Sequence, residues 1–191
     1  QNDLLTLLGA GFLGEVEGGS RGDHTAKTYA IFASVDYRFN EQFEMTIGAR
    51  HTWEEKDFFW VQNDLEAIFG APVLGGTGSA EASDSWDETT PTVTLRYHYS
   101  DDVMLYGTYS RGFKSGGYNV DSGVPSQQAA GFDPEFLDNY ELGLKSTWFD
   151  QRLLVNASLY AMQWEDIHIR ADDPSTPGSF DPRIDNAGEA Y

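Results

Sequence analysis

The 191-residue sequence contains no cysteine. Disulfide bridges and thiol catalysis are therefore excluded. Basic residues are also scarce, since 12 lysines and arginines face 31 aspartates and glutamates and the formal net charge is -19. Nucleic-acid binding depends on basic side chains that neutralise phosphates, so we expect no nucleic acid among the partners.

Long apolar runs are missing as well. The longest hydrophobic patch lies around residues 4–8, far short of the roughly 18 residues that indicate a transmembrane helix. This absence excludes a membrane-spanning helix. It leaves a transmembrane β-barrel open, because the strands of a barrel alternate lipid-facing and lumen-facing residues and give a weak hydropathy signal.

Apolar residues recur with a period of two in several segments. Residues 28–39 and 43–53 alternate in this way and flank the short polar turn 40–42, which predicts a β-hairpin. The same pattern begins near residue 93 and leads through the turn 100–102 into the second strand of another predicted hairpin, 103–113, whose own pattern is ambiguous because aromatics fall on both parities. The period of two predicts a third hairpin across the turn 150–151, with strands starting near 140 and 153.

Three long connections separate these hairpins and are rich in Gly, Pro, Ser and Asp: residues 54–88, 115–134 and 171–185. Tight turns alternating with long connections are typical of outer-membrane barrels. The strands are also long enough for the about 9–11 residues that cross a bilayer at a tilt. The pattern alone leaves a soluble β-sandwich open as the alternative.

Aromatic residues flank each tight turn, where they predict an interfacial girdle of a membrane barrel. In a soluble sandwich the same rings would be cross-strand pairs. The residues concerned are Tyr37, Phe39, Phe43, Tyr97, Tyr99, Trp148 and Phe149.

The segment "VMLYGTYSRGFKSGGYN", followed by "FDPEFLDNYELGLKSTWFDQRLLVNASLYAMQWEDI", resembles the β-barrel of TonB-dependent outer-membrane receptors. The matching motifs are Gly-Phe-Lys-Ser-Gly-Gly at 112–117, Pro-Glu at 134–135 and the strand at 139–145. "FASVDYRFNEQFEMTIGARHTWEEK" upstream and "DNAGEAY" at 185–191 match as well. The resemblance covers residues 29–191.

The resemblance implies an all-β fold, an antiparallel transmembrane β-barrel. Barrels of the family have roughly 22 strands around a plugged lumen. We expect this chain to supply six full strands and the start of a seventh. Residues 1–191 would then all belong to the barrel domain, without the plug domain, and both ends would continue into a longer protein.

An aromatic cluster in the first long connection supplies candidate ligand-binding residues. Phe58, Phe59 and Trp60 follow a run of acidic residues and could stack on a planar ligand. The interpretation we prefer is that they continue the strand as aromatics of the upper rim.

The Gly-rich motif supplies the other candidates, Arg111, Lys114 and Tyr118. The two cations come where a strand reaches the outer rim. There they either reach lipid headgroups or acidic loops, which we prefer, or contact the ligand. The glycines at 112, 116 and 117 would let the backbone bend away from the regular strand.

Other chemistries find little support in the sequence. Residues 9–14 fit the pattern Gly-x-Gly-x-x-Gly, but no helical pattern follows them. Acidic pairs lie in turns and connections, and the four histidines lack metal-ligand spacing. We therefore expect no enzyme activity, no catalytic residue, no metal site and no cofactor.

The resemblance implies active import across the outer membrane of a Gram-negative bacterium. Ferric siderophores are the expected substrate class, with vitamin B12, haem and glycans as alternatives. The expected partners are the nutrient ligand, outer-membrane lipid and the TonB complex, the last through the missing N-terminal region. Two alternatives stay open: a passive porin-like or structural barrel, and a soluble carbohydrate-binding sandwich.

Overall fold

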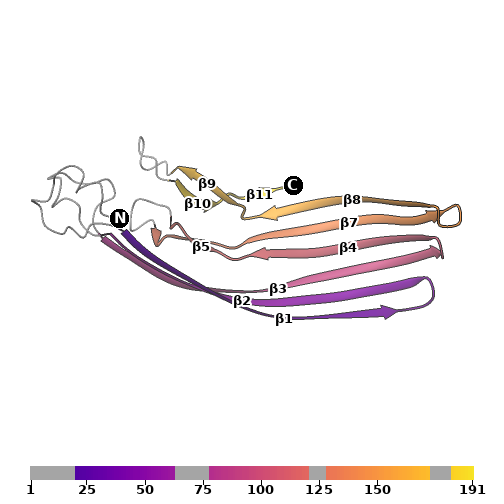
Figure 1. Cartoon of the computed structure of the whole chain (residues 1–191), viewed down its shortest axis with the longest axis horizontal. Helices are drawn as coiled ribbons and strands as arrows, with labels where there is room; N and C mark the ends of the chain where they lie inside the picture. The colour runs from indigo at the N-terminus through magenta and orange to yellow at the C-terminus, as the bar shows by residue number, and fades with distance from the viewer. Residues whose placement is uncertain (1–19, 63–77, 121–127, 173–181) are drawn as a thin grey trace, which may run out of the picture.

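The computed structural model describes residues 20–62, 78–120, 128–172 and 182–191. Most of these residues lie in long antiparallel strands (Figure 1). The strands are β1 (Ser20–Arg38), β2 (Phe43–Gln62), β3 (Gly78–Ser100), β4 (Val103–Lys114), β5 (Gly117–Tyr118), β6 (Gly131–Phe132), β7 (Glu135–Trp148), β8 (Leu153–Glu165), β9 (His168–Asp172), β10 (Pro182–Asn186) and β11 (Glu189–Ala190).

One seven-stranded sheet carries the fold, in the order β1-β2-β3-β4-β7-β8-β11. Neighbours along the chain pair as hairpins, except that β7 follows β4 in the sheet and β11 pairs with β8. The predicted six full strands are confirmed, and so is the start of a seventh within "DNAGEAY". The sheet does not close on itself, so it is an open segment of a barrel.

The register places every predicted apolar stripe on the same side of the sheet. One row of paired residues runs across six strands: Val35, Ile47, Val93, Tyr109, Tyr140 and Ala161. We call this side the apolar face and the opposite side the polar face. A slip by one residue would exchange the two faces of a strand, so the alternation itself specifies the register.

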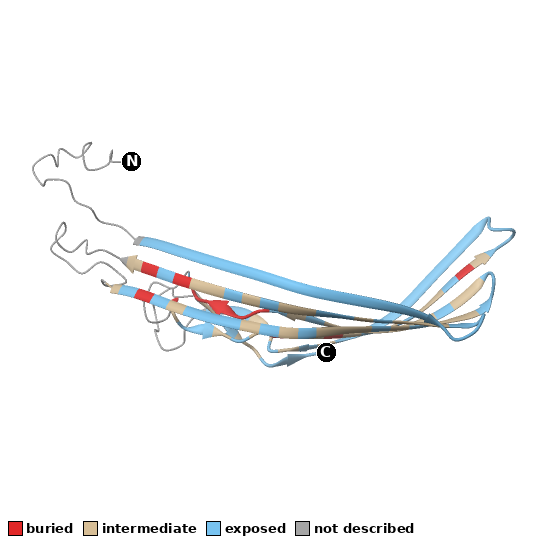
Figure 2. Cartoon of the chain, turned by 90° about the horizontal axis from the view of Figure 1, so that it is seen from below, coloured by how far each residue is buried: buried red, intermediate tan, exposed pale blue. Residues whose placement is uncertain are grey.

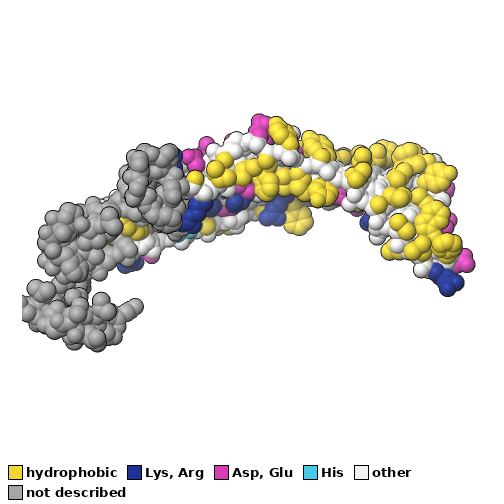
Figure 3. Space-filling view, turned by 90° about the horizontal axis from the view of Figure 1, so that it is seen from above, with side chains coloured by type: hydrophobic (Ala, Val, Ile, Leu, Met, Phe, Trp, Pro, Cys, Tyr) yellow, Lys and Arg dark blue, Asp and Glu magenta, His cyan; other side chains and the backbone are white. Residues whose placement is uncertain are grey.

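The apolar face remains exposed to its surroundings. Leu142 and Leu159 are 68% and 79% exposed, and hydrophobic side chains gather over the half of the molecule that ends in the tight turns (Figure 3). A β-sandwich would cover this face with a second sheet. The remaining strands of the described ranges form only the two-stranded ladders β9–β10 and β5–β6, so the sandwich prediction is not supported.

The apolar stretches have a consistent length. On the apolar face they run through residues 29–37, 43–53, 140–148 and 153–161. These lengths agree with the about 9–11 residues with which a tilted strand crosses a bilayer. We call this zone the apolar band.

The three predicted tight turns are confirmed, and all lie at one end of the sheet (Figure 1). In the first, the Asn40 side-chain oxygen accepts hydrogen bonds from the backbone N–H groups of Gln42 and Phe43 at 2.8 and 2.9 Å. In the third, three successive residues, Phe149–Gln151, have positive φ angles of 54–65°. The predicted aromatics surround these turns, and Phe43 stacks on Tyr97 with ring centroids 4.8 Å apart.

The connections between the hairpins are shorter in the structure than the sequence predicted. β2 and β3 stay paired from Phe43–Tyr97 to Gln62–Gly78, so the connection predicted at 54–88 shrinks to 63–77. The strands were underestimated because polar residues enter the apolar face above the band, where Lys27 lies 3.8 Å from Glu55. The segment 115–134 contains the ladder β5–β6, and 171–185 belongs partly to the hairpin β9–β10.

Among the described residues, no helix is both long enough and apolar enough to span a membrane.

Candidate functional site

The polar face carries hydrogen-bonding side chains along its whole length. Near the tight turns, Arg96 donates to Glu44 at 3.0 Å and to Thr46 at 2.7 Å. Further along β2, the same face presents Arg50, Glu54 and Lys56. A polar wall of this kind is typical of the inside of a membrane barrel.

Lys56 organises a cluster at the end of the sheet away from the tight turns. Its ammonium group donates to the Ser115 hydroxyl at 2.8 Å and to the Gly116 carbonyl at 2.7 Å. It also lies 3.1 Å from the Glu54 carboxylate, which accepts a hydrogen bond from Ser115 at 2.6 Å. These bonds tie the segment that follows β4 to the polar face of β2.

Gly116 is required by this close approach. A Cβ atom at this position would lie 2.2 Å from the Phe132 carbonyl oxygen, so the backbones of β6 and of the segment after β4 meet without room for a side chain. The predicted role of Gly112 is wrong, since this residue stays inside the regular strand β4. Bending away begins only beyond Lys114.

Tyr118 is the centre of a small aromatic core and is 5% exposed. Its ring stacks on Phe58 at 5.8 Å between centroids. Its hydroxyl donates to Asp84 at 3.2 Å and lies 3.3 Å from the Lys56 carbonyl. Burial and the neighbouring Asp84 carboxylate raise the pKa of Tyr118 to about 12.

The structure separates the three aromatic candidates of β2. Phe58 and Trp60 are buried on the polar face together with Ala80 and Tyr118. Phe59, at the intervening position, points to the apolar side and is 41% exposed. β2 continues through all three residues as preferred, but Phe58 and Trp60 are not rim aromatics, because they are buried in this core. Phe58 and Trp60 line a 320 Å³ pocket with Tyr118, which leaves their ligand contact as a prediction.

The two cations of the Gly-rich motif bind carboxylates of neighbouring strands. Arg111 lies 2.8 Å from Asp138 on β7 and 3.4 Å from Glu165 on β8, with its guanidinium 4.6 Å from the Phe136 ring centroid. Lys114 lies 3.5 Å from Glu135 on β7. Both residues therefore cross-link the sheet where the regular strands end.

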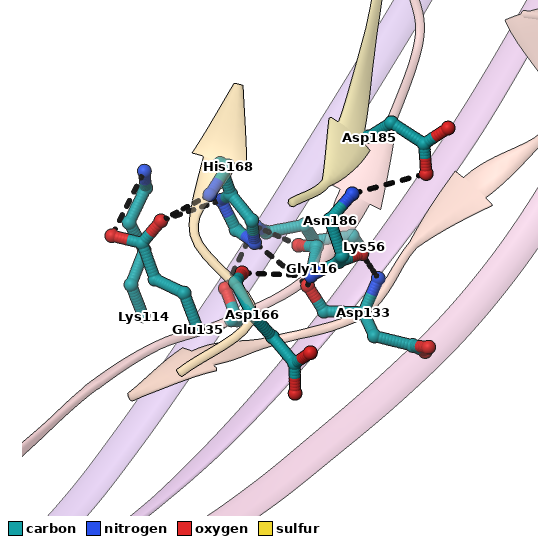
Figure 4. A network of polar contacts seen from close by, with 10 residues as sticks. Lys56, Lys114, Gly116, Asp133, Glu135, Asp166, His168, Asp185 and Asn186 are labelled. Atoms are coloured by element: carbon teal, nitrogen blue, oxygen red, sulfur yellow. Dashed lines mark hydrogen bonds and ion pairs between the residues drawn. The ribbon is translucent and has the colours of Figure 1, made fainter. Parts of the chain in front are cut away.

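A network of polar contacts attaches the β9–β10 hairpin to the first residue of β7 and to the segment before it (Figure 4). The Glu135 carboxylate accepts the His168 backbone N–H at 2.8 Å, and the His168 imidazole lies 2.7 Å from the Asp133 carbonyl. Asn186 donates to the carbonyls of Asp133 and Asp166, both at 2.9 Å. We call this network the hairpin anchor.

The hairpin anchor stabilises the ionised form of Glu135. Burial works to raise the pKa of this carboxyl group, but the His168 N–H and the charges of Lys114 and His168 outweigh it. The pKa of Glu135 therefore lies below its ordinary value. The carboxylate stays ionised at neutral pH and holds the hairpin in place.

The hairpin and the polar face enclose a pocket of about 650 Å³. Its volume lies within the range of roughly 300–1,000 Å³ of sites for small molecules. The lining residues are Thr28, Arg50, Thr52, Glu54, Lys56, Phe113, Lys114, Ser115, Phe132, His168, Ile169, Arg170 and Ile184. Of the six residues predicted from the sequence, Lys114 alone lines this pocket.

Sequence reasoning missed Arg50, Lys56 and Arg170 as pocket residues. Arg50 and Lys56 lie six residues apart in β2, whereas Arg170 lies in β9, and only the three-dimensional fold brings it to the same pocket. The period of two could have assigned Arg50 and Lys56 to one face. In the described part of the chain, no group of three or more His, Cys, Asp or Glu residues is placed to hold a metal ion.

Comparison with known proteins matches the chain to one family of receptors. A family model described as "TonB dependent receptor-like, beta-barrel" matches residues 3–191. The ferric-pyoverdine M114 receptor PbuA of Pseudomonas sp. (strain M114) is 23% identical over 164 residues, which cover 85% of this chain and 18% of that receptor. The chain thus spans about a fifth of the length of this relative.

Two solved structures share the fold. The ferric yersiniabactin uptake receptor FyuA from Yersinia pestis superposes with a TM-score of 0.68 at 22% identity, over 89% of this chain and 23% of that one. The siderophore receptor PiuA from Acinetobacter baumannii gives a TM-score of 0.58 at 18% identity, over 88% of this chain and 22% of that one.

Proposed function

Because the chain belongs to the family of TonB-dependent receptor-like β-barrels, we propose that it is part of an outer-membrane active transporter. The transporter imports a ferric siderophore or a similarly scarce, bulky nutrient into a Gram-negative bacterium. Its energy comes from the TonB complex, through a plug domain that these residues do not supply. The chain itself forms barrel wall and has no enzymatic role.

One observation carries this proposal. The same strands have an exposed apolar face, in a band that fits the bilayer, and a polar face that bears a pocket. Lipid would cover the first face and the lumen would adjoin the second. A nutrient that passes through the lumen would therefore meet the pocket.

The named relatives support the iron part of the proposal. The three proteins compared above are described as receptors for ferric pyoverdine, ferric yersiniabactin and a siderophore. Each resembles this chain over a fraction of its own length. Substrate and energy coupling are therefore proposed for the complete receptor to which the chain belongs.

The test uses the full-length receptor in detergent and in cells. Ferric siderophores should quench its tryptophan fluorescence, while the iron-free chelators, cobalamin and oligosaccharides should not. Uptake of radiolabelled ferric siderophore should stop when the proton gradient is collapsed. Uptake that persists without the gradient would indicate the porin-like alternative, and quenching by a glycan or cobalamin alone would overturn the substrate class.

A further inference from the structure

We propose that the 650 Å³ pocket selects ferric chelates with a net negative charge, and that Arg50 is the side chain that recognises this charge. The inference rests on the proposed function and deepens it. Siderophore complexes divide into anionic ones, with catecholate or carboxylate ligands, and uncharged ones, with hydroxamate ligands. The pocket's charges favour the first class.

The pocket is cationic in a strongly acidic chain. Arg50, Lys56, Lys114 and Arg170 line it, together with one carboxylate, that of Glu54. The whole chain has a formal net charge of -19. A recess lined by charges of one sign focuses the field and raises the local concentration of ligands of the opposite sign.

Lys56 and Lys114 are already paired with carboxylates of the protein, and Arg170 also has an interaction partner. Lys56 lies 3.1 Å from Glu54 and also binds Ser115 and Gly116. Lys114 lies 3.5 Å from Glu135. Neither side chain could bind an anionic ligand without weakening an existing contact.

The contacts of Arg50 differ from those of the two lysines. Its Nε atom donates to the Thr52 hydroxyl at 3.2 Å, and within the described ranges no carboxylate lies within 4.0 Å of its guanidinium nitrogens. The two terminal nitrogens can therefore present a planar fork to the pocket. This fork matches a pair of oxygen atoms, as in a carboxylate or a catecholate.

The rest of the pocket suits a chelate of this kind. Phe132 lines the pocket, with its ring centroid 4.7 Å from that of the His168 imidazole, and it can stack on an aromatic arm of a catecholate. The hydroxyls of Thr28 and Thr52 add polar contacts beside Arg50. The pocket combines the apolar and polar groups typical of a small-molecule site.

Three variants of the full-length receptor test the inference. Arg50→Gln removes the charge and Arg50→Lys keeps it without the fork. Lys145→Gln is the control, because Lys145 lies on the polar face outside the pocket, with its ammonium 5.6 Å from the Tyr106 ring centroid. The probes are a ferric tris-catecholate and a ferric citrate-type complex, both anionic, and an uncharged ferric tris-hydroxamate, measured by fluorescence quenching.

We expect the wild type to bind an anionic chelate more tightly than the uncharged one. Arg50→Gln should raise the Kd of the anionic chelate about tenfold or more and change that of the hydroxamate less than about twofold. Arg50→Lys should fall between the two, and Lys145→Gln should match the wild type.

Failure of the charge selectivity and failure of the proposed iron import would give different results. A wild type that binds only the uncharged chelate overturns the charge selectivity but retains iron import, and a receptor that binds no ferric chelate overturns both. An Arg50→Gln variant with unchanged affinities overturns the role of Arg50. A lower Tm together with unchanged affinities would show that Arg50 stabilises the receptor and does not recognise the ligand.

Discussion

The half of the sheet that ends in tight turns and the half that bears the pocket are built from the same strands in different ways. In the turn half, large apolar residues such as Leu159 point outward and are exposed. In the pocket half, the described residues include a buried aromatic core around Phe58 and Tyr118. Apart from Ser146, the buried residues lie in this second half (Figure 2).

The difference shows where each half obtains its stability. The turn half satisfies its backbone through strand pairing but buries little apolar surface, so its side chains require an apolar environment. The pocket half makes its own contacts, through Lys56 and the hairpin anchor. A single strand can thus serve two environments, because the side chains on each of its faces differ between the turn half and the pocket half.

A charge on the apolar face should produce the largest effect. We expect Leu159→Arg in the full receptor to destabilise it by about 2–4 kcal/mol, because the arginine would lie against lipid. The measurement is urea unfolding in lipid vesicles. Ser158→Arg is the matched control on the polar face of the same strand and should cost much less. Equal losses would contradict the assignment of the two faces.

A methyl group at Gly116 tests the close packing of the pocket half. The Cβ atom of Gly116→Ala would lie 2.2 Å from the Phe132 carbonyl oxygen, so we expect a loss of about 1–3 kcal/mol. Thermal unfolding provides the measurement. Gly112→Ala is the control, since its Cβ would meet Leu137 at an ordinary 3.7 Å. A Gly116→Ala variant as stable as this control would disprove the close approach.

The ionisation of Tyr118 should make the stability of the folded protein depend on pH. Its folded pKa of about 12 lies above the ordinary value of 10.0, so the native state holds the phenolic proton more tightly than the unfolded state. This contribution to stability is present below pH 10 and is lost as the pH rises towards 12. Absorbance titration of the wild type against Tyr118→Phe should reveal one late-ionising tyrosine.

The same substitution removes a buried hydroxyl that binds Asp84. We expect Tyr118→Phe to cost about 1 kcal/mol and to flatten the dependence of stability on pH above 10. A Tyr118→Phe titration curve that matches the wild type at high pH would show that Tyr118 does not ionise late.

The hairpin anchor should give the smallest effect. The pKa of Glu135 lies below its ordinary value of 4.5, so its contribution is present at neutral pH and is lost as the pH falls through that lowered value. Glu135→Gln keeps an acceptor oxygen, and we expect a local loss of about 0.5–1 kcal/mol. Hydrogen exchange at the His168 amide should accelerate, while exchange at the tight turns stays unchanged. Acceleration at both ends would contradict a local anchor.

Much of the fold could be predicted from the sequence. The tight turns and the apolar stripes are local patterns, so the six strands could be predicted, and a period of two gave the facing direction of all but β4, whose aromatics fall on both parities. The upper parts of β2 and β3 were missed, because polar residues such as Glu55 and Asp57 take the apolar-face positions there and hide the pattern. The ladders β5–β6 and β9–β10 were missed because they are two to five residues long.

The candidate site was predicted less completely. Phe58 and Trp60 were selected as part of an aromatic cluster and Tyr118 as part of the Gly-rich motif. The structure brings the three together although Trp60 and Tyr118 are 58 positions apart in the sequence. Arg50 gave no local signal, because an arginine in an alternating strand resembles any solvated residue. Its significance depends on how far its guanidinium group lies from the carboxylates of the described residues, and only the three-dimensional structure reports these distances.

The position of the tight turns also bears on how such a sequence can change over generations. Adding one residue between Ser100 and Val103 would shift the pairing of β3 with β4 and turn an entire stripe inward. The connection between β2 and β3, residues 63–77, is much longer than the tight turns, so one further residue changes its closure entropy little. Length differences between descendants of this gene should therefore collect at the pocket end, where new residues could alter which molecules are captured without disturbing the wall.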